Sequence, residues 1–440
     1  MGIIDRYYAY APYVREMNIW FRNVEEVEVV GPLATRRRGD LETGRLGEQG
    51  TRRRGDKETG RRGEQGIGYE HSKLDFTEVP SFNFLSFSSA IKSFFKIPFI
   101  FYKISGAMRR ADHLHLRCPG NVGLLACFCQ IFFPSKPKSA KYAGNWDPQA
   151  KQPWTYRFQK WILSNTFLTR NMQVLVYGKW EGQTKNIVPF FTASFSEKEK
   201  TEVPKKAFSG PFTFLFVGNL VEGKGPLEAV KLVEELNVRL RGGTDLEIHA
   251  SRILLKIYGA GPERERLKEY CRKNKLEDLV LFKGSRPLEE LKEAYQNSHF
   301  VILPSISEGW PKAIAEGMFF GCIPVATPVS CVPWMLGSGS RGILLESQES
   351  RANPPALKLP RAGSQDGSTE CSVVSDQWSE DVEKIFQLMK DRREMQKMSE
   401  AAKEWSQQYT LEKFEAAIQE VLKKSNEKSS SPFGRGGGVG

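Results

Sequence analysis

Apolar and polar positions alternate regularly in the C-terminal half of the chain. Short apolar runs that predict strands stand at residues 212–218, 253–259, 279–284, 299–305 and 323–327. Between these runs, apolar residues recur every three or four positions, as in the helix that Pro226 opens. Strands that are apolar throughout and separated by helices predict a parallel sheet covered on both faces. Ligands of such sheets bind beyond the carboxyl ends of the strands.

The N-terminal half has a less regular pattern, which favours a second, smaller nucleotide-fold-like domain. The elements predicted there are strands at 26–33, 112–117 and 172–178 and apolar helices at 84–104 and 121–133. Residues 378–424 predict three helices, of which the last is amphipathic. We therefore expect an α/β protein with domains at 1–205 and 206–400, a helix at 401–425 that packs back on the first domain, and a flexible tail at 426–440.

Two segments interrupt this pattern. Residues 35–50 and 51–66 are nearly identical 16-residue repeats with almost no apolar residues, so no face is available to bury. We interpret 35–66 as a disordered insertion. The alternative is an arginine-rich nucleic-acid arm, but its interleaved acids and lack of aromatic residues argue against that reading. Residues 347–375 are rich in Ser, Pro and Gly and predict a surface loop.

The net charge of the 440 residues is +12, and the repeat holds nine Arg and one Lys against six acids, a net +4. A basic surface suits nucleotide diphosphates, acidic lipid headgroups or nucleic acid. The seven cysteines are scattered, without the paired spacing of a metal site, which favours a reducing, intracellular setting. The apolar run 124–133 is too short to cross a bilayer, and the N-terminus lacks a signal-peptide core. These features predict a soluble protein, or one that touches a membrane from the side.

Two Gly-rich turns follow the first two predicted strands of the C-terminal half. The stretch VGNLVEGKGP (217–226) places glycines and Lys224 between a strand and a helix start. Backbone N–H groups at a helix N-terminus together with one ammonium can hold a diphosphate. The stretch IYGAGP (257–262) ends the next strand. Each turn alone is equally consistent with a simple tight turn, but both fall on the same edge of the predicted sheet.

A third turn at this edge carries two carboxylates. In PSISEGWPKAIAEGM (304–318), Glu308 precedes a helix and Glu316 lies within it. The two acids are about 12 Å apart along a helix, too far for a close carboxylate pair but suited to two parts of one extended ligand. Glu308 could instead complement the helix dipole and Glu316 could lie on a solvated face. Because Glu316 stands in an apolar helix, where an unpaired carboxylate is costly, we favour a functional role.

The C-terminal half resembles the family 4 retaining glycosyltransferases of the GT-B fold. The resemblance spans about 205–345 and rests on the loop from Gly218 to Gly225, the G-x-G turn at Gly259 and Gly261, and the E-x7-E of SEGWPKAIAEGMFFGCIPVAT. It implies two Rossmann-like doubly wound domains facing a cleft, the N-terminal one on the acceptor side and the C-terminal one binding a nucleotide sugar.

The resemblance also implies the roles of individual residues. Lys224 would neutralise the leaving diphosphate, Glu308 would bind hydroxyls of the donor sugar, and Glu316 would bind the ribose. The base would sit near 259–261 and 284–286. The predicted catalytic residues are Lys224, Glu308 and Arg117, and the predicted substrate-binding residues are Gly218, Asn219, Gly225, Gly259, Gly261, Ser285, Arg286, Gly309, Trp310, Pro311, Lys312, Glu316, His115 and Asn121. No metal and no cofactor are expected; the donor substrate is a UDP- or GDP-sugar.

This chain departs from the family pattern in three places. Asn219 stands where the family usually has Arg, so one of two cations is absent. In DHLHLRCPGN, His115 matches the first His of the family's H-x-H, but Arg117 replaces the second. The stretch MGIIDRYYAYAPYVREM resembles the helix that follows the family's first strand and Gly-rich acceptor loop, so that strand is expected to be missing. The chain is therefore either an active enzyme or an inactive, mis-started version of one.

The function implied is transfer of a hexose, with retention of configuration, from a nucleoside-diphosphate sugar to a glycan or lipid-linked acceptor in surface polysaccharide biosynthesis. A GT-B sugar-nucleotide epimerase and a non-catalytic nucleotide- or nucleic-acid-binding remnant are the alternatives. We expect a cytoplasmic protein and no nucleic-acid partner. The basic, apolar helix at 84–104, with Arg109 and Arg110, could lie on an anionic membrane at the inner face, or it could be a buried crossover.

Overall fold

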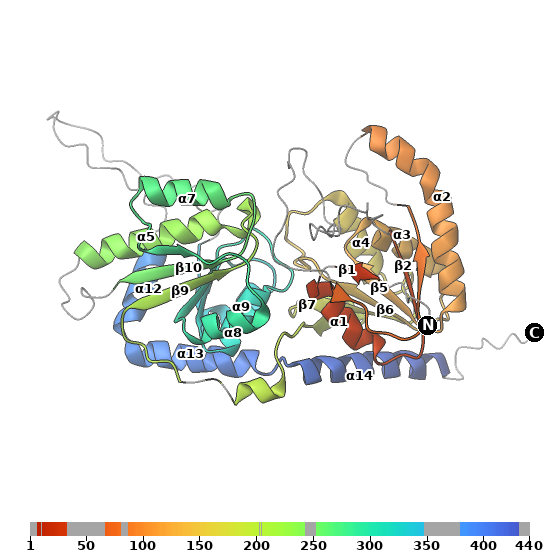
Figure 1. The fold of residues 1–440 in the computed structure, drawn as a ribbon. Helices are drawn as coiled ribbons and strands as arrows, with labels where there is room; N and C mark the ends of the chain where they lie inside the picture. Colours follow the sequence, from red (N-terminus) through yellow and green to blue (C-terminus); the bar gives the residue numbers. More distant parts are fainter. Residues whose placement is uncertain are drawn as a thin grey trace, which may run out of the picture. The chain divides into compact units, whose positions relative to one another are not determined.

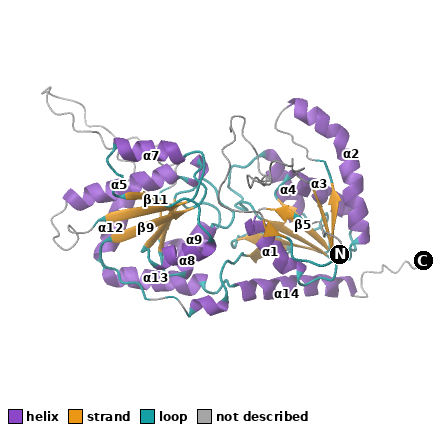
Figure 2. Cartoon of the chain, viewed as in Figure 1, coloured by secondary structure: helices purple, strands orange, loops and turns teal. Residues whose placement is uncertain are grey.

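The computed structural model describes residues 7–9, 11–32, 67–80, 87–201, 203, 205–242, 252–346 and 379–430. Compactness divides the chain into two units: the first comprises 1–197, 308–310 and 408–440, and the second comprises 198–307 and 311–407. Figure 2 shows the strands of each unit enclosed by helices. The predicted insertion at 35–66 and the predicted loop at 347–375 lie outside the described residues.

The second unit is built on a six-stranded, wholly parallel sheet. Its strands are β9 (Phe212–Val217), β10 (Ile253–Tyr258), β11 (Val280–Phe282), β12 (Phe300–Leu303), β13 (Ile323–Ala326) and β14 (Ile343–Leu344). They are ordered β11-β10-β9-β12-β13-β14. Numbered along the chain this is 3-2-1-4-5-6, the order of the doubly wound dinucleotide-binding fold. The strand order therefore reverses between β9 and β12.

Helices cover both faces of this sheet, as the apolar strands require (Figure 1). The helices are α5 (Pro226–Gly242), α7 (Arg264–Lys273), α8 (Leu288–Gln296), α9 (Lys312–Phe319), α10 (Val332–Met335), α12 (Ser379–Lys390) and α13 (Arg392–Ser406). One face packs against α5, and the other packs against α9 and α13. The central strand β12 is buried throughout, so its carboxyl end is held rigidly. A rigid sheet edge is what a binding site needs.

The first unit has a four-stranded parallel sheet in the order β5-β6-β7-β8. Its strands are β5 (Leu114–Cys118), β6 (Lys138–Tyr142), β7 (Met172–Tyr177) and β8 (Ile187–Phe190). One face packs against α2 (Phe87–Arg110), α3 (Asn121–Cys129) and α4 (Trp154–Ser164). The other packs against α1 (Ala11–Phe21) and α14 (Leu411–Ser430). The Gln173 side chain of β7 also donates a hydrogen bond to the Val421 carbonyl of α14, at 3.0 Å.

Short elements complete the first unit. They are the pairs β1 (Tyr8–Ala9) with β3 (Ile67–Gly68), antiparallel, and β2 (Val27–Gly31) with β4 (Leu74–Glu78), parallel, and the 3-10 helix η1 (Gln130–Phe132). In the part of the chain that the structure describes, no helix is long and apolar enough to cross a membrane.

The sequence pattern did not predict β6, whose sequence KSAKY contains two lysines yet is buried at all five positions. The Lys138 ammonium donates to the carbonyls of Gln130 and Phe133, at 3.3 and 2.9 Å. Lys141 lies 2.9 Å from a carboxylate oxygen of Glu16 in α1. Both lysines therefore have partners inside the unit. Because paired charges can be buried at a lower cost than unpaired ones, this polar stretch can form a central strand.

Candidate functional site

Four turns meet at the carboxyl edge of the second unit's sheet. The turn after β9 is joined to the turn after β10 by hydrogen bonds from Gly218 N to Tyr258 O and from Leu220 N to Ala260 O, both 3.0 Å. The turn after β12 joins it through Ile306 N and Gly223 O, also at 3.0 Å. In the same way, Gly259 N donates to Gly284 O after β11, at 3.0 Å. The edge that the sequence predicted is thus one connected backbone structure at the point where the strand order reverses.

Glycines are required where these turns touch. A Cβ on Gly259 would stand 1.8 Å from the Gly218 carbonyl oxygen, and one on Gly261 would stand 2.2 Å from that of Leu220. Gly225 has φ +66° and would place a Cβ 2.2 Å from the Pro304 carbonyl oxygen. Any side chain at these three positions would push the turns apart, because the obstacle is backbone.

Lys224 ends the short 3-10 helix η3 (Glu222–Lys224), one residue before the left-handed Gly225 that leads into α5. The backbone N–H groups of Lys224 and Gly225 already donate to the carbonyls of Val221 and Glu222, at 3.0 Å each. These two N–H groups are therefore engaged within the turn. The half-buried Lys224 side chain and the first turn of α5 are the cationic elements of this loop.

The two carboxylates of the third turn lie in different surroundings. Glu308, in the connection from β12 to α9, is 7% exposed. Glu316 lies within α9 and is half-buried. The hydroxyl of Tyr295, a fully buried residue of α8, donates a hydrogen bond to Glu316 Oε2 at 3.0 Å. Within the apolar helix, Glu316 therefore has a partner of its own, the buried Tyr295 phenol, and a functional role of Glu316 stays a prediction.

Two polar residues beside the predicted site residues were not predicted from the sequence. Tyr295 could not be found by pattern, since its ring reads as an ordinary apolar position of α8. Ser305, directly beyond β12, is 1% exposed, and its hydroxyl has no hydrogen-bond partner in the described part of the chain. Its carbonyl accepts a hydrogen bond from the Thr327 hydroxyl at the end of β13, at 2.5 Å. For Ser305 the only signal in the sequence is its place directly after the apolar strand run.

The base-side turn carries Ser285 and Arg286 after β11. Arg286 Nε donates to the Lys283 carbonyl at 2.9 Å, and its Nη1 lies 3.4 Å from a carboxylate oxygen of Glu290 in α8. Burial raises the pKa of the nearby Tyr258 phenol, which therefore stays neutral at physiological pH. This turn thus presents neutral groups and a cation already paired to an acid.

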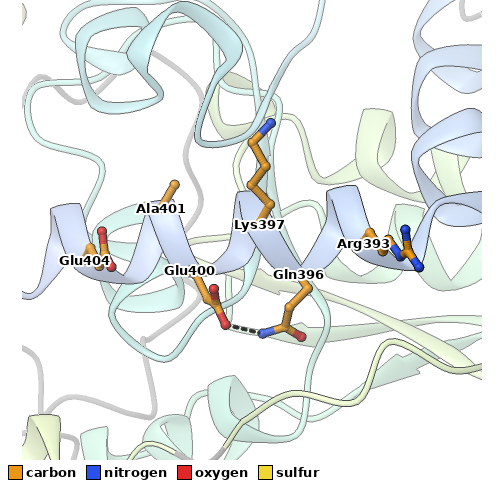
Figure 3. A pocket seen from close by; sticks show the side chains of 6 residues that line it. All are labelled: Arg393, Gln396, Lys397, Glu400, Ala401 and Glu404. Carbon is orange, nitrogen blue, oxygen red and sulfur yellow. Dashed lines mark hydrogen bonds between the residues drawn. The ribbon is translucent and has the colours of Figure 1, made fainter.

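A shallow hollow of about 480 Å³ lies elsewhere on the second unit, along α13 (Figure 3). Its lining consists of Arg393, Gln396, Lys397, Glu400, Ala401 and Glu404. Gln396 donates to Glu400 at 2.8 Å within the helix, as the dashed line marks. None of the residues predicted for the site lines it. It is one mixed-charge helix face and not a part of the strand-end edge.

Residues 197–353 match the family described as glycosyl transferases group 1. The matched stretch, 157 of the 440 residues, is similar to this glycosyltransferase family. The matched region contains every one of the four turns described above. The assignment to family 4 within these glycosyltransferases stays a prediction.

Curated relatives agree with the family. WcaL of Escherichia coli, a glycosyltransferase assigned to colanic acid biosynthesis, is 28% identical over 207 residues, which are 45% of this chain and 47% of WcaL. A D-inositol 3-phosphate glycosyltransferase of Corynebacterium urealyticum is 30% identical over 145 residues, 32% of this chain and 33% of that protein. The chain thus matches about half the length of WcaL and a third of the second relative.

Solved structures extend the likeness to most of the chain. A glycosyltransferase from Rickettsia africae superposes with a TM-score of 0.53 at 14% identity, covering 81% of this chain and 86% of that one. Anabaena HepE, solved with UDP and glucose, gives 0.51 at 14% identity, covering 80% and 86%. At this identity the likeness concerns the fold alone. The predicted fold class, an α/β protein of the GT-B type, is confirmed.

Two of the predicted N-terminal site residues, His115 and Arg117, lie at the face of the first unit's sheet that α1 covers. Arg117 makes an ion pair with Glu16 of α1, whose side chain is 4% exposed, and Lys141 shares that carboxylate. Burial is the largest single influence and lowers the Arg117 pKa, but Glu16 together with Tyr177 and Tyr13 outweighs it, so the Arg117 pKa stands above its ordinary value. The Glu16 ion pair thus fixes the position of Arg117 within the first unit, and its catalytic role stays a prediction.

His115 is enclosed in the same interface. Its Nδ1 lies 2.9 Å from the Ser139 hydroxyl, and the ring of Trp20 packs on it with centroids 4.2 Å apart. Burial, with a smaller contribution from the neighbouring His113, lowers the His115 pKa to about 3. A neutral, covered imidazole is a packing residue in this structure; its role toward a substrate stays a prediction. Asn121 begins α3, just beyond β5.

Among the described residues, no group of three or more His, Cys, Asp or Glu side chains is arranged to hold a metal ion.

Proposed function

We propose that this protein transfers a hexose from a nucleoside-diphosphate sugar to an acceptor, with retention of configuration. The observation that carries the proposal is the joined set of Gly-dependent turns at the strand-order reversal, with Lys224 beside the start of α5. Doubly wound sheets bind nucleotides at this point. The family match over the same residues supports the reading.

Each group at this edge has a proposed task. The Lys224 ammonium stabilises the negative charge that builds on the departing diphosphate, which is the main electrostatic demand of the reaction. The positive end of α5 acts in the same direction. Glu316 accepts hydrogen bonds from the ribose hydroxyls. Glu308 accepts hydrogen bonds from hydroxyls of the donor sugar, which the backbone of 309–312 also binds. Carboxylates suit these tasks because ionised they only accept hydrogen bonds.

The acceptor is proposed to be a glycan or a lipid-linked glycan of surface polysaccharide assembly. The proposal for the acceptor rests on the 28% identity to WcaL, which is assigned to colanic acid biosynthesis. We place the protein in the cytoplasm, working at the inner face of the membrane when the acceptor is lipid-linked. The donor is proposed to be a UDP- or GDP-sugar, which the reaction uses without a further cofactor.

The test is a panel of UDP- and GDP-sugars incubated with the purified full chain, with and without glycan or lipid-linked acceptors. Donor consumption that requires an acceptor and yields a retained linkage supports transfer, and Lys224→Ala should lower the rate at least a hundredfold. Lys231→Ala, a half-buried lysine of α5 outside the loop, is the matched control. Isomerised sugar nucleotide formed from donor alone would assign the epimerase reaction instead. Nucleotide binding without turnover of any donor would assign the non-catalytic alternative.

A further inference from the structure

The helical layer of the first unit carries most of the chain's excess positive charge. Residues 87–170 contain 13 Lys and Arg but only two acids, Asp112 and Asp147, a net +11 in a chain of net +12. Of these bases, Lys138 and Lys141 are buried inside the unit. The others lie largely on α2, α4 and the connections beside them. Such a concentration of one sign indicates a polyanionic partner.

Large aromatic side chains stand exposed among these charges. Phe95, Phe99 and Tyr102 of α2 are 77, 50 and 74% exposed, and Phe132 of η1 is 71% exposed. The spacing of the first three, at positions i, i+4 and i+7, places them in one stripe along the helix. The opposite side of α2 is occupied by the buried Ile100, Ile104 and Met108 of the unit's core. The stripe is therefore not the side by which α2 packs on its sheet.

Basic groups flank this stripe along its length. The Lys103 ammonium lies 5.6 Å from the centroid of the Phe99 ring, and Lys96 and Arg109 are exposed on the same half of the helix. Lys136 donates to the carbonyls of Arg109, at 2.7 Å, and Ala111, so it sits at the end of α2. Phe132 meets the half-buried Phe101 of α2 edge-on, with centroids 6.0 Å apart, so η1 packs beside α2. We call these exposed aromatic and basic residues the α2 face.

We propose that the α2 face docks the protein onto an anionic lipid bilayer, with the aromatic rings in the headgroup region and the lysines against the lipid charges. A helix with exposed Phe and Tyr between Lys and Arg, and with its other side held by the protein, suits binding in the interface plane. Figure 1 shows α2 (orange) running along the outside of the first unit. Bulky rings on a convex helix fit a deformable lipid surface better than a nucleic acid, which is bound in grooves.

This inference rests on the proposed function only in that a lipid-linked acceptor would be presented at such a surface. Its test needs no donor or acceptor, so its failure and the failure of the transferase proposal are distinguishable. The full chain is sedimented with vesicles of phosphatidylglycerol and phosphatidylcholine in equal parts, and with vesicles of phosphatidylcholine alone. Binding to the first and at least tenfold weaker binding to the second is expected, and the difference should shrink as salt rises.

Two variant pairs locate the surface. Phe95→Ser with Tyr102→Ser should lower vesicle binding more than tenfold. Trp154→Ser with Phe167→Ser, a pair 69 and 70% exposed outside the α2 face, should leave it within about twofold. Because all four side chains are largely exposed, both variants should keep the thermal unfolding profile of the parent chain.

The charges are tested in the same way. Lys96→Gln with Lys103→Gln should weaken binding about 25-fold, at about fivefold for each charge near an anionic surface. Lys268→Gln with Lys397→Gln in the second unit is the control for net charge. Equal binding to both kinds of vesicle, or equal loss in the control pairs, overturns the proposal. So does retention of single-stranded RNA that the α2 variants lose while vesicle binding stays unchanged, since the face would then serve nucleic acid.

Discussion

Replacing Tyr295 by Phe removes one hydroxyl and should weaken nucleotide binding without unfolding the protein. Tyr295 is fully buried and donates to Glu316 Oε2 at 3.0 Å. Phe fills the space of the tyrosine ring, so the substitution opens no large cavity. It removes only the hydroxyl that donates to Glu316 Oε2. Burial, together with the Glu316 carboxylate, raises the Tyr295 pKa well above its ordinary value, so the phenol acts only as a donor at working pH. The proton on this hydroxyl fixes the direction of the carboxylate.

The size of the effect follows from the kind of hydrogen bond. A hydrogen bond to a charged group contributes about 1.5–3 kcal/mol. Glu316 is half-buried, so water can replace the phenol in part, and we expect the lower end. About 1.4 kcal/mol is a tenfold change in an equilibrium constant, so the Kd for UDP or GDP should rise about tenfold. A role of Tyr295 in stability alone would lower the melting temperature but leave the Kd unchanged.

Isothermal titration of UDP and GDP into the wild type and Tyr295→Phe measures this difference. Tyr270→Phe is the matched control, since its hydroxyl donates to Glu234 of α5 at 2.7 Å and lies away from the joined turns. The control should lose a comparable amount of stability and keep its nucleotide affinity. An unchanged Kd in Tyr295→Phe, or an equal rise in both variants, would refute the view that the phenol positions Glu316 for a ligand.

Three further predictions concern the turns and the first unit. Gly225→Ala should abolish nucleotide binding, because its Cβ would meet the Pro304 carbonyl oxygen at 2.2 Å. Gly182→Ala in the first unit, equally left-handed with φ +67° but in open space, should cost only about 1 kcal/mol of unfolding free energy in urea titrations and keep binding. Glu16→Gln should destabilise the first unit by about 3–5 kcal/mol, since two cations lose their buried carboxylate, and a urea midpoint within error of the wild type would contradict this. Burial lowers the pKa of His113 to about 4 and that of His115 to about 3, so both are neutral when folded but protonate near pH 6.5 when unfolded. The contribution of the two neutral histidines to the free energy of unfolding is therefore fully present above pH 6.5. It falls between pH 6.5 and pH 4, by at most about 1.4 kcal/mol per pH unit for each histidine. Replacing both by Gln should make the melting temperature less dependent on pH between pH 7 and 5.

The sequence predicted the second unit well because each element there has one clear signal. Apolar runs gave the strands, and the glycines marked the turns that the structure joins at one edge. The contacts themselves were not predictable: the partner of Glu316 is Tyr295, 21 positions away, on a helix where a tyrosine reads as an apolar residue.

The first unit was harder to predict because its polar residues are inside. The lysines of β6 hid a central strand, and a strand that ends in His115 and Arg117 suggested a ligand edge. In the structure those side chains face α1, where Glu16 satisfies Arg117 and Trp20 covers His115. A local motif does not tell which neighbouring helix supplies the counter-charge, since that depends on long-range packing.

The proposal that the joined turns of the second unit hold a nucleotide diphosphate through Lys224 is tested most directly by titration calorimetry of UDP and GDP. The wild type and Lys231→Ala should bind at least one of the two nucleotides with the same affinity. Lys224→Ala should bind it about 10- to 100-fold more weakly, the loss of one charged contact. Undiminished affinity in Lys224→Ala, or no heat of binding from either nucleotide with the wild type, would contradict the account.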